Sequence, residues 1–280
     1  MREIIEVQEL RKIQMEIMSE VHRFCQEHNI KYFLWGGSLL GAIRHNGYIP
    51  WDDDIDIAMP REDYEYFCEN FGNERYKVVC CKNDKNYFLP FAKAYDSLTI
   101  KDEAIHYVSK KRYGIDVDIF PIDKIGNHEE VKKTERKRLR CIKRLALSNF
   151  KFQKSKSFAR TMARILKNML CVIGRFFGIL NANREANKIN RIVQSFDGGL
   201  DDLMLYADSN IEKPFYMKKA WCENIRAKAF EHLELNCTEG YDQILTQAYG
   251  DYMTPPPENK RVTHHSFKVY WKDNCNQEEK

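Results

Sequence analysis

The stretch that decides the fold is WGGSLLGAIRHNGYIPWDDDIDIAM, residues 35–59. Its first half, GGSLLGAIRH (36–45), predicts a tight turn that runs into a short helix, and Asn46-Gly47 is strong turn chemistry. Its second half, DIDIAM (54–59), alternates acidic and apolar residues. In a strand, this alternation places Asp54 and Asp56 on one face and the isoleucines on the other. The stretch therefore predicts a helix and a strand joined by an acidic turn.

Four carboxylates crowd into five residues at Asp52, Asp53, Asp54 and Asp56. Like charges this close repel one another, and burying them is costly unless a cation compensates. Hard divalent cations such as Mg²⁺ prefer oxygen ligands and share their shell with substrate phosphates. A solvated acidic turn is the simpler alternative, but the apolar residues on both sides of the run favour a metal site.

Gly37 and Ser38 lie between a predicted strand (30–35) and the predicted helix. Glycine lets the backbone approach a phosphate closely, and the N–H groups of a helix N-terminus bind anions. A plain turn with Ser38 as its N-cap is the alternative. A further acidic strand, IDVDIFPID (115–123), places Asp116 and Asp118 on one face. Asp118 could supply another metal ligand or a general base, and a solvated edge strand is the alternative.

The rest of the chain predicts an α/β (or α+β) fold, with one mixed sheet flanked by helices. Apolar residues recur at helical spacing from Leu10 to Cys25, and a second helix is predicted after Pro60. We expect a catalytic core at 1–126, a basic helical insertion at 127–200, and a C-terminal part at 201–280 that completes the core and the rim of the site. In the C-terminal part, KAFEHLEL (228–235) predicts one strand and TEGYDQILTQAYG (238–250) one helix.

The segment 160–180 is strongly amphipathic, with Arg160, Arg164, Lys167 and Arg175 on one helical side and large apolar residues elsewhere. A helix of this kind can lie in a membrane interface. The alternative, which we favour at this point, is a helix packed on the catalytic domain with a solvated basic edge.

Bulk properties exclude some classes of protein. The formal net charge of +4 is too small to indicate nucleic-acid binding. The N-terminus lacks the pattern of a secretion signal, and nine cysteines without C-x-x-C pairs are typical of a reducing compartment. We therefore expect a cytoplasmic location, with contact at the inner face of the membrane through 160–180 as an open alternative.

The glycine pair and serine, the short helix, the D-x-D strand and the later carboxylate strand together form the pattern of the nucleotidyltransferase fold. More closely, GGSLLGAIRHNGYIPWDDDIDIAMPREDYE (36–65), DVDIFPID (116–123) and YGDYMTPPPENKRVTHH (249–265) resemble the LicD family of phosphocholine transferases. The fukutin-type enzymes, which transfer ribitol phosphate, are similar around the W-D-x-D-x-D core.

The resemblance implies roles for particular residues. Asp54 and Asp56, with Asp52, would hold Mg²⁺ (or Mn²⁺), and Asp118 would complete the metal site or accept the acceptor's proton. Other residues would bind the substrate's phosphates, as the resemblance implies for Gly37, Ser38, Arg44 and Lys93. His265 lies in a segment that is similar to the family's histidine-containing region, and its role is open.

The resemblance also implies an activity. The family takes a phosphoalcohol, typically phosphocholine from a CDP-alcohol donor, and attaches it to a sugar hydroxyl of a glycan or lipid-linked saccharide, releasing CMP. One alternative keeps the site but transfers NMP to a small molecule and releases pyrophosphate. A second alternative is a non-catalytic adaptor that binds membrane or glycan.

Overall fold

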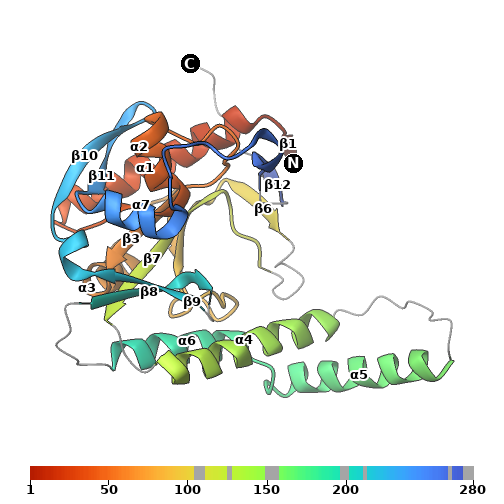
Figure 1. Cartoon of the computed structure of the whole chain (residues 1–280). Coiled ribbons are helices and arrows are strands. Elements are labelled where there is room, and N and C mark those ends of the chain that lie inside the picture. Colours follow the sequence, from red (N-terminus) through yellow and green to blue (C-terminus); the bar gives the residue numbers. More distant parts are fainter. Residues whose placement is uncertain are drawn as a thin grey trace.

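The computed structural model describes residues 1–103, 111–124, 128–148, 158–195, 202–210, 213–263 and 267–273. The fold is a mixed α/β architecture, as predicted, built around one main sheet (Figure 1). The central strand order is β2-β3-β7-β5-β4, and β8 and β9 extend the sheet from β7. The strands span Phe33–Leu34 (β2), Asp56–Pro60 (β3), Tyr76–Val79 (β4), Ala92–Asp96 (β5), Asp116–Lys124 (β7), Asp202–Asn210 (β8) and Lys213–Lys218 (β9).

Strands β3 and β7 run parallel at the middle of the sheet, with Asp56 opposite Asp118 and Ile57 opposite Ile119. The neighbouring pairs β2–β3 and β5–β7 are antiparallel. The apolar residues of β3 and β7 are buried, which explains why these segments are rich in isoleucine. The two acidic strands found in the sequence are therefore adjacent in space.

Three helices flank the sheet: α1 (Val7–Glu27), α2 (Gly36–His45) and α3 (Arg61–Asn70). Helix α1 buries the predicted apolar stripe, including Leu10, Ile17 and Val21, against β5 and β7. Helix α3 begins after Pro60 and packs on β3 and β7. These predicted helices are confirmed.

The C-terminal part contains a hairpin of β10 (Ile225–Phe230) and β11 (Leu233–Thr238), followed by α7 (Tyr241–Tyr249). The prediction of one strand at 228–235 is wrong, because the chain reverses at Glu231, which has a left-handed φ of 54°. The Glu231 carboxylate accepts a hydrogen bond from the Tyr48 backbone N–H, at 3.0 Å, and so holds the turn against the segment that precedes the aspartate run at 52–54. A smaller sheet joins β1 (Arg2–Ile4), β12 (Phe267–Trp271) and β6 (Thr99–Glu103).

The predicted basic helical region forms three helices: α4 (His128–Ser148), α5 (Phe158–Phe176) and α6 (Ala182–Gln194). They form a layer beside the sheet (Figure 1). Arg138 of α4 donates to the Phe88 carbonyl at 2.9 Å, and Asn183 of α6 donates to the Cys81 carbonyl at 2.8 Å. These bonds attach α4 and α6 to the loop that precedes β5.

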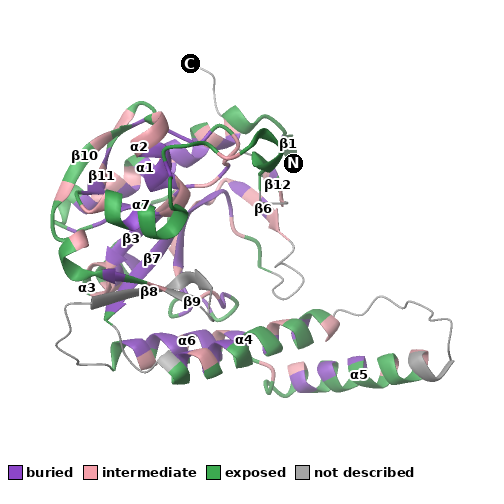
Figure 2. Cartoon of the chain, viewed as in Figure 1, coloured by how far each residue is buried: buried purple, intermediate pink, exposed green. Residues whose placement is uncertain are grey.

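Helix α5 does not bury its apolar side on the catalytic domain, so the alternative we favoured from the sequence is wrong. Figure 2 shows most of α5 as exposed, and Leu166, Leu170 and Phe176 are among its exposed apolar residues. Among the helices that the structure describes, none has both the length and the apolar composition needed to cross a bilayer.

Candidate active site

The N-terminus of α2 is the point at which the acidic side chains meet the glycine pair. A Cβ atom on Gly36 would lie 3.4 Å from Asp56 Oδ2, and one on Gly37 would lie 2.5 Å from Asp52 Oδ2. Gly36 also has a φ of 52°, which side chains rarely adopt. Consecutive Cα atoms are about 3.8 Å apart, so the two carboxylates approach the same short piece of backbone. Glycine is needed here because the carboxylates fill the space that side chains would take.

The acidic loop gathers its own carboxylates. Ligand oxygens of Asp52, Asp53 and Asp54 all lie within 4.8 Å of one another, which is close enough to share one cation. Burial raises the pKa of Asp52 to about 7, and the charge of Asp54 and a hydrogen bond between the two side chains act in the same direction. This crowding favours either a proton or a cation at Asp52.

The alternation of acidic and apolar residues predicted that Asp54 and Asp56 lie on one strand, but Asp54 lies outside it. Strand β3 begins at Asp56, and the first bond that links this segment to β7 runs from the Asp118 N–H to the Ile55 carbonyl, at 2.9 Å. Asp54 therefore belongs to the loop, where it pairs with Asp52. Asp56 stands at the start of the strand and faces Gly36.

Two side chains of α1 hold the backbone of this loop. Arg11 Nη2 donates to the carbonyls of Ile49 and Asp52, at 3.0 and 2.5 Å, and Gln14 Nε2 donates to the Asp53 carbonyl at 2.9 Å. These contacts were not predicted from the sequence. Gln14 could have indicated one of them, because it is a polar residue on the buried side of an amphipathic helix.

Ser38 is buried, and its hydroxyl oxygen accepts a hydrogen bond from the Asp56 N–H at 2.9 Å. The hydroxyl thus joins the start of α2 to the start of β3, and its own proton can still be donated to a phosphate oxygen. The Trp35 N–H donates to the Asp56 carbonyl at 2.9 Å and strengthens the same junction.

Lys93 of β5 lies between the two carboxylates of β7. Its Nζ is 2.7 Å from Asp116 Oδ2 and 2.7 Å from Asp118 Oδ1. Burial disfavours the ammonium, but the charges of Asp116 and Asp118 outweigh it and raise the pKa of Lys93 well above its usual range. Lys93 is therefore a fixed positive charge beside Asp118.

The pKa values of the two β7 aspartates are shifted in opposite directions. Burial opposes ionisation of Asp116, but Lys101 and Lys93 outweigh it and lower its pKa to about 2. Lys101 Nζ lies 2.6 Å from Asp116 Oδ1. At Asp118, burial and the neighbouring Asp116 prevail over Lys93 and raise the pKa to about 6. A carboxyl group tuned in this way is suited to exchange a proton near neutral pH.

Arg44 and His265 are the remaining predicted residues. Arg44, near the end of α2, donates to the Tyr252 carbonyl at 2.5 Å and to His45 Nε2 at 3.0 Å. Burial lowers the pKa of Arg44, and the charge of Arg261 acts in the same direction. Arg44 thus connects α2 to the C-terminal segment. His265 lies outside the described residues. The catalytic and binding roles of all these residues stay predictions.

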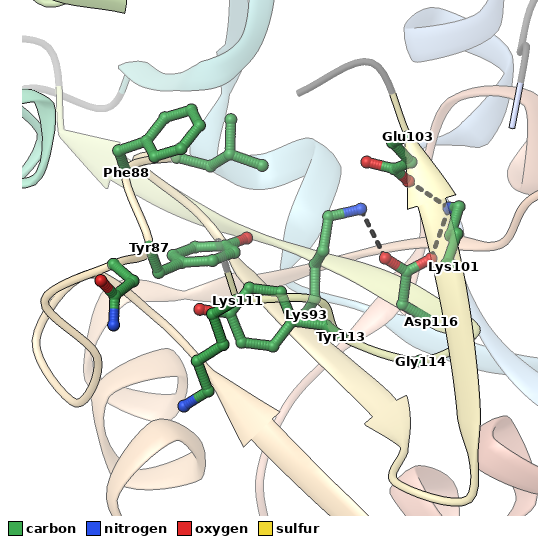
Figure 3. Close-up of a pocket in the computed structure, with 11 residues that line it drawn as sticks. Tyr87, Phe88, Lys93, Lys101, Glu103, Lys111, Tyr113, Gly114 and Asp116 are labelled. Carbon is green, nitrogen blue, oxygen red and sulfur yellow. Dashed lines mark hydrogen bonds and ion pairs between the residues drawn. The ribbon is translucent and has the colours of Figure 1, made fainter. Parts of the chain in front are cut away.

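A small pocket adjoins Lys93 and Asp116 (Figure 3), and its empty space of about 410 Å³ includes the solvent at its open side. Aromatic rings form one side of it, with Tyr87 and Tyr113 edge to face at 5.7 Å between centroids. Tyr87 is buried, and its hydroxyl has no hydrogen-bond partner within the described part of the chain. The other residues that line the cavity are Asn86, Phe88, Leu89, Lys101, Glu103, Lys111 and Gly114.

Several of these neighbours could not be predicted from the sequence. Lys101 lies on β6, which was not predicted, and its backbone N–H donates to the Tyr113 carbonyl at 2.8 Å, just before β7, which brings its side chain to Asp116. The Tyr249 hydroxyl lies 4.0 Å from the position of a Cβ on Gly36, which brings the end of α7 to the glycine pair.

Comparison with known proteins relates this site to one family. Residues 29–162 match the family described as LicD/FKTN/FKRP, nucleotidyltransferase domain. The lipopolysaccharide cholinephosphotransferase LicD of Haemophilus influenzae is 30% identical over 261 residues, which cover 91% of this chain and 94% of that protein. The human and mouse ribitol 5-phosphate transferases FKRP are each 56% identical over 34 residues, which cover 12% of this chain and 7% of theirs.

The domain match contains the glycine pair, the acidic loop, Lys93 and Asp118. The match to the Haemophilus protein extends over nearly the whole of both chains. Together with the mixed fold, these matches establish that the chain belongs to the LicD family.

Proposed function

We propose that this chain transfers phosphocholine from CDP-choline to a sugar hydroxyl of a glycan or lipid-linked saccharide, with release of CMP and with the help of Mg²⁺ or Mn²⁺. The observation that carries the proposal is the gathering of carboxylates at the glycine-rich start of α2. A helix N-terminus beside acidic side chains suits a diphosphate only when a cation lies between the two negative groups. The near full-length similarity to a cholinephosphotransferase supports the choice of phosphocholine.

The residues fit a divalent cation. Three loop carboxylates present oxygens within 4.8 Å of one another, and the pKa of Asp52 is raised by burial and by the neighbouring Asp54 charge, both of which a cation would offset. Asp52, Asp54 and Asp56 are the candidate ligands, with Asp118 on the adjacent strand. When bound, the cation would neutralise charge on the donor's phosphates as it develops.

The residues of the chain would also take up the acceptor's proton and bind the phosphate oxygens during the transfer. The acceptor oxygen bonds to the phosphorus that carries the alcohol, the bond from that phosphorus to the bridging oxygen breaks, and CMP leaves with the electron pair. The acceptor's proton passes to a carboxylate, for which Asp118 is the candidate. Lys93 supplies a permanent positive charge beside it, and the N–H groups of Gly37 and Ser38 hold phosphate oxygens.

Tyr87 and Tyr113 line the pocket next to Lys93. The Tyr87 hydroxyl, which has no hydrogen-bond partner among the described residues, can donate to an ester or phosphate oxygen.

The test is incubation with Mg²⁺ and a panel of CDP-alcohols, with and without candidate saccharides, scoring CMP. The proposal expects CMP release that depends on the acceptor and is fastest with CDP-choline. Asp56→Asn should lower the rate at least about 100-fold, whereas the exposed control Asp273→Asn should leave it unchanged. Pyrophosphate release from CTP and a small phosphorylated acceptor would instead identify a nucleotidyltransferase. Unchanged glycan modification by an Asp54→Ala/Asp56→Ala variant would point to the non-catalytic adaptor.

A further inference from the structure

Helix α5 meets the rest of the chain with its polar side. It packs on α4, and its buried residues include Asn168 and Cys171. Arg175 Nη1 donates to the Ser148 hydroxyl of α4 at 3.1 Å. At 3.6 residues per turn, these three α5 residues fall on one side of the helix. A helix of a water-soluble fold normally does the reverse and turns its apolar side inward.

The opposite side of α5 and the turn that follows it expose large apolar side chains. Their exposed fractions run from 47% at Val172 to 84% at Phe176. They make up half of the exposed large apolar residues in the described part of the chain, so they form a patch rather than scattered exceptions. The patch consists of Met162, Leu166, Met169, Leu170, Val172, Ile173, Phe176, Phe177 and Ile179.

The surroundings of this patch are positively charged. Between residues 136 and 184 the sequence has 14 Lys and Arg and no Asp or Glu. Arg164 and Lys167 are exposed on α5, and Arg140, Lys143 and Arg144 are exposed on α4. If a second copy of the chain covered the patch, two such regions would face each other and repel. An anionic surface would attract them.

We propose that α5 lies flat in the headgroup region of an anionic lipid bilayer, with its apolar patch at the acyl boundary and the exposed basic residues of α5 and α4 near the lipid phosphates. An exposed apolar side with Lys and Arg beside it, on a helix about 28 Å long, is what in-plane membrane binding requires. Juxtaposed basic residues add attraction to anionic headgroups. Helices α4 and α6 join α5 to the loop before β5, so docking holds the catalytic sheet near the bilayer. The use of this docking to reach a lipid-linked acceptor rests on the proposed function; the docking itself does not.

The test is co-sedimentation of the full chain with two kinds of vesicle. One is made of neutral phosphatidylcholine alone, and in the other about 30% of the lipid is anionic phosphatidylglycerol. We expect binding to the anionic vesicles, weaker binding to the neutral ones, and loss of binding as salt is raised. A triple variant removes apolar surface and keeps good helix formers: Leu166→Gln/Leu170→Gln/Phe176→Gln. Its affinity for anionic vesicles should fall by about tenfold or more.

The matched control removes three exposed apolar residues elsewhere, Ile5→Gln/Met253→Gln/Val262→Gln, and should bind as the wild type does. Equal binding by the wild type and the α5 variant would overturn the proposal, as would absence of wild-type binding to anionic vesicles. A wild-type dimer that the α5 variant converts to monomers would identify a second copy as the occupant instead. CMP release with a water-soluble acceptor should be the same in all three proteins, so failure of the transferase proposal and failure of the docking proposal give different results.

Discussion

Replacing Gly37 with alanine tests how closely the backbone of α2 approaches the acidic loop. The new Cβ would lie 2.5 Å from Asp52 Oδ2, whereas ordinary contact begins at 3.4 Å, so the carboxylate has to withdraw by about 0.9 Å. A displacement of about 1 Å in a catalytic group can lower the rate about 100-fold. This corresponds to about 2.7 kcal/mol of lost transition-state stabilisation.

The folding stability of the Gly37→Ala variant should rise or stay the same. Gly37 lies in a helix and has no left-handed φ, and alanine in a helix is more stable than glycine by about 0.5–1 kcal/mol. We therefore expect kcat/KM for the CDP-alcohol to fall about 100-fold while the melting temperature stays at or above that of the wild type. Steady-state kinetics and a thermal melt on the same preparation check both parts.

A double-mutant cycle with Asp52→Ala isolates the cause. Once the carboxylate is removed, nothing opposes the new Cβ at 2.5 Å, so Gly37→Ala should cost less than about threefold in that background. The explanation fails if Gly37→Ala keeps the wild-type kcat/KM, or if it lowers activity by the same factor whether or not Asp52 is present.

Three further predictions follow from the electrostatics. Chelation with EDTA should abolish turnover, and Mg²⁺ at 100 times its Kd should stabilise the fold by about 2.7 kcal/mol; a melting curve insensitive to the cation, with activity that survives EDTA, would contradict this. Asp116→Asn should destabilise the fold by about 1–3 kcal/mol at pH 7, because Lys93 and Lys101 each lose one of two carboxylate partners and keep Asp118 and Glu103, respectively. The pKa of Asp116 is depressed to about 2 in the fold, so this contribution is present above the unfolded pKa near 4 and is lost as pH falls toward 2; urea titrations of both proteins should converge over that range. Arg61→Lys should weaken the paired hydrogen bonds to Asp123, at 2.6 and 2.5 Å, and lower the free energy of unfolding by about 1–3 kcal/mol, while the exposed control Arg226→Lys should not.

Local sequence patterns were sufficient to predict those helices and strands that have a distinctive periodicity or starting motif. The periodicity of α1 and the glycine-led start of α2 predicted those helices, and the alternation around Asp56 predicted β3. Hairpin β10–β11 was predicted as one strand because its turn depends on Glu231 meeting Tyr48, a contact between residues far apart in the sequence.

The site was predictable where its residues are close in sequence. The acidic loop and the glycine pair could be found together, but the buried set of Lys93, Lys101 and Asp116 joins three strands and has no local signature. Helix α5 shows the same limit in another form. Its sequence defines a polar and an apolar side, but the side that meets α4 is shown by the buried Asn168 and Cys171 and by the hydrogen bond from Arg175 to Ser148.

We propose that the carboxylates at the start of α2 hold a divalent cation against the donor's phosphates. Electron paramagnetic resonance of the Mn²⁺-loaded chain with CDP-choline measures this directly, through magnetic coupling between the bound ion and phosphorus. We expect phosphorus coupling in the wild type and its loss in Asp52→Ala/Asp56→Ala. Bound Mn²⁺ without phosphorus coupling, or the same coupling in the variant, would contradict the claim.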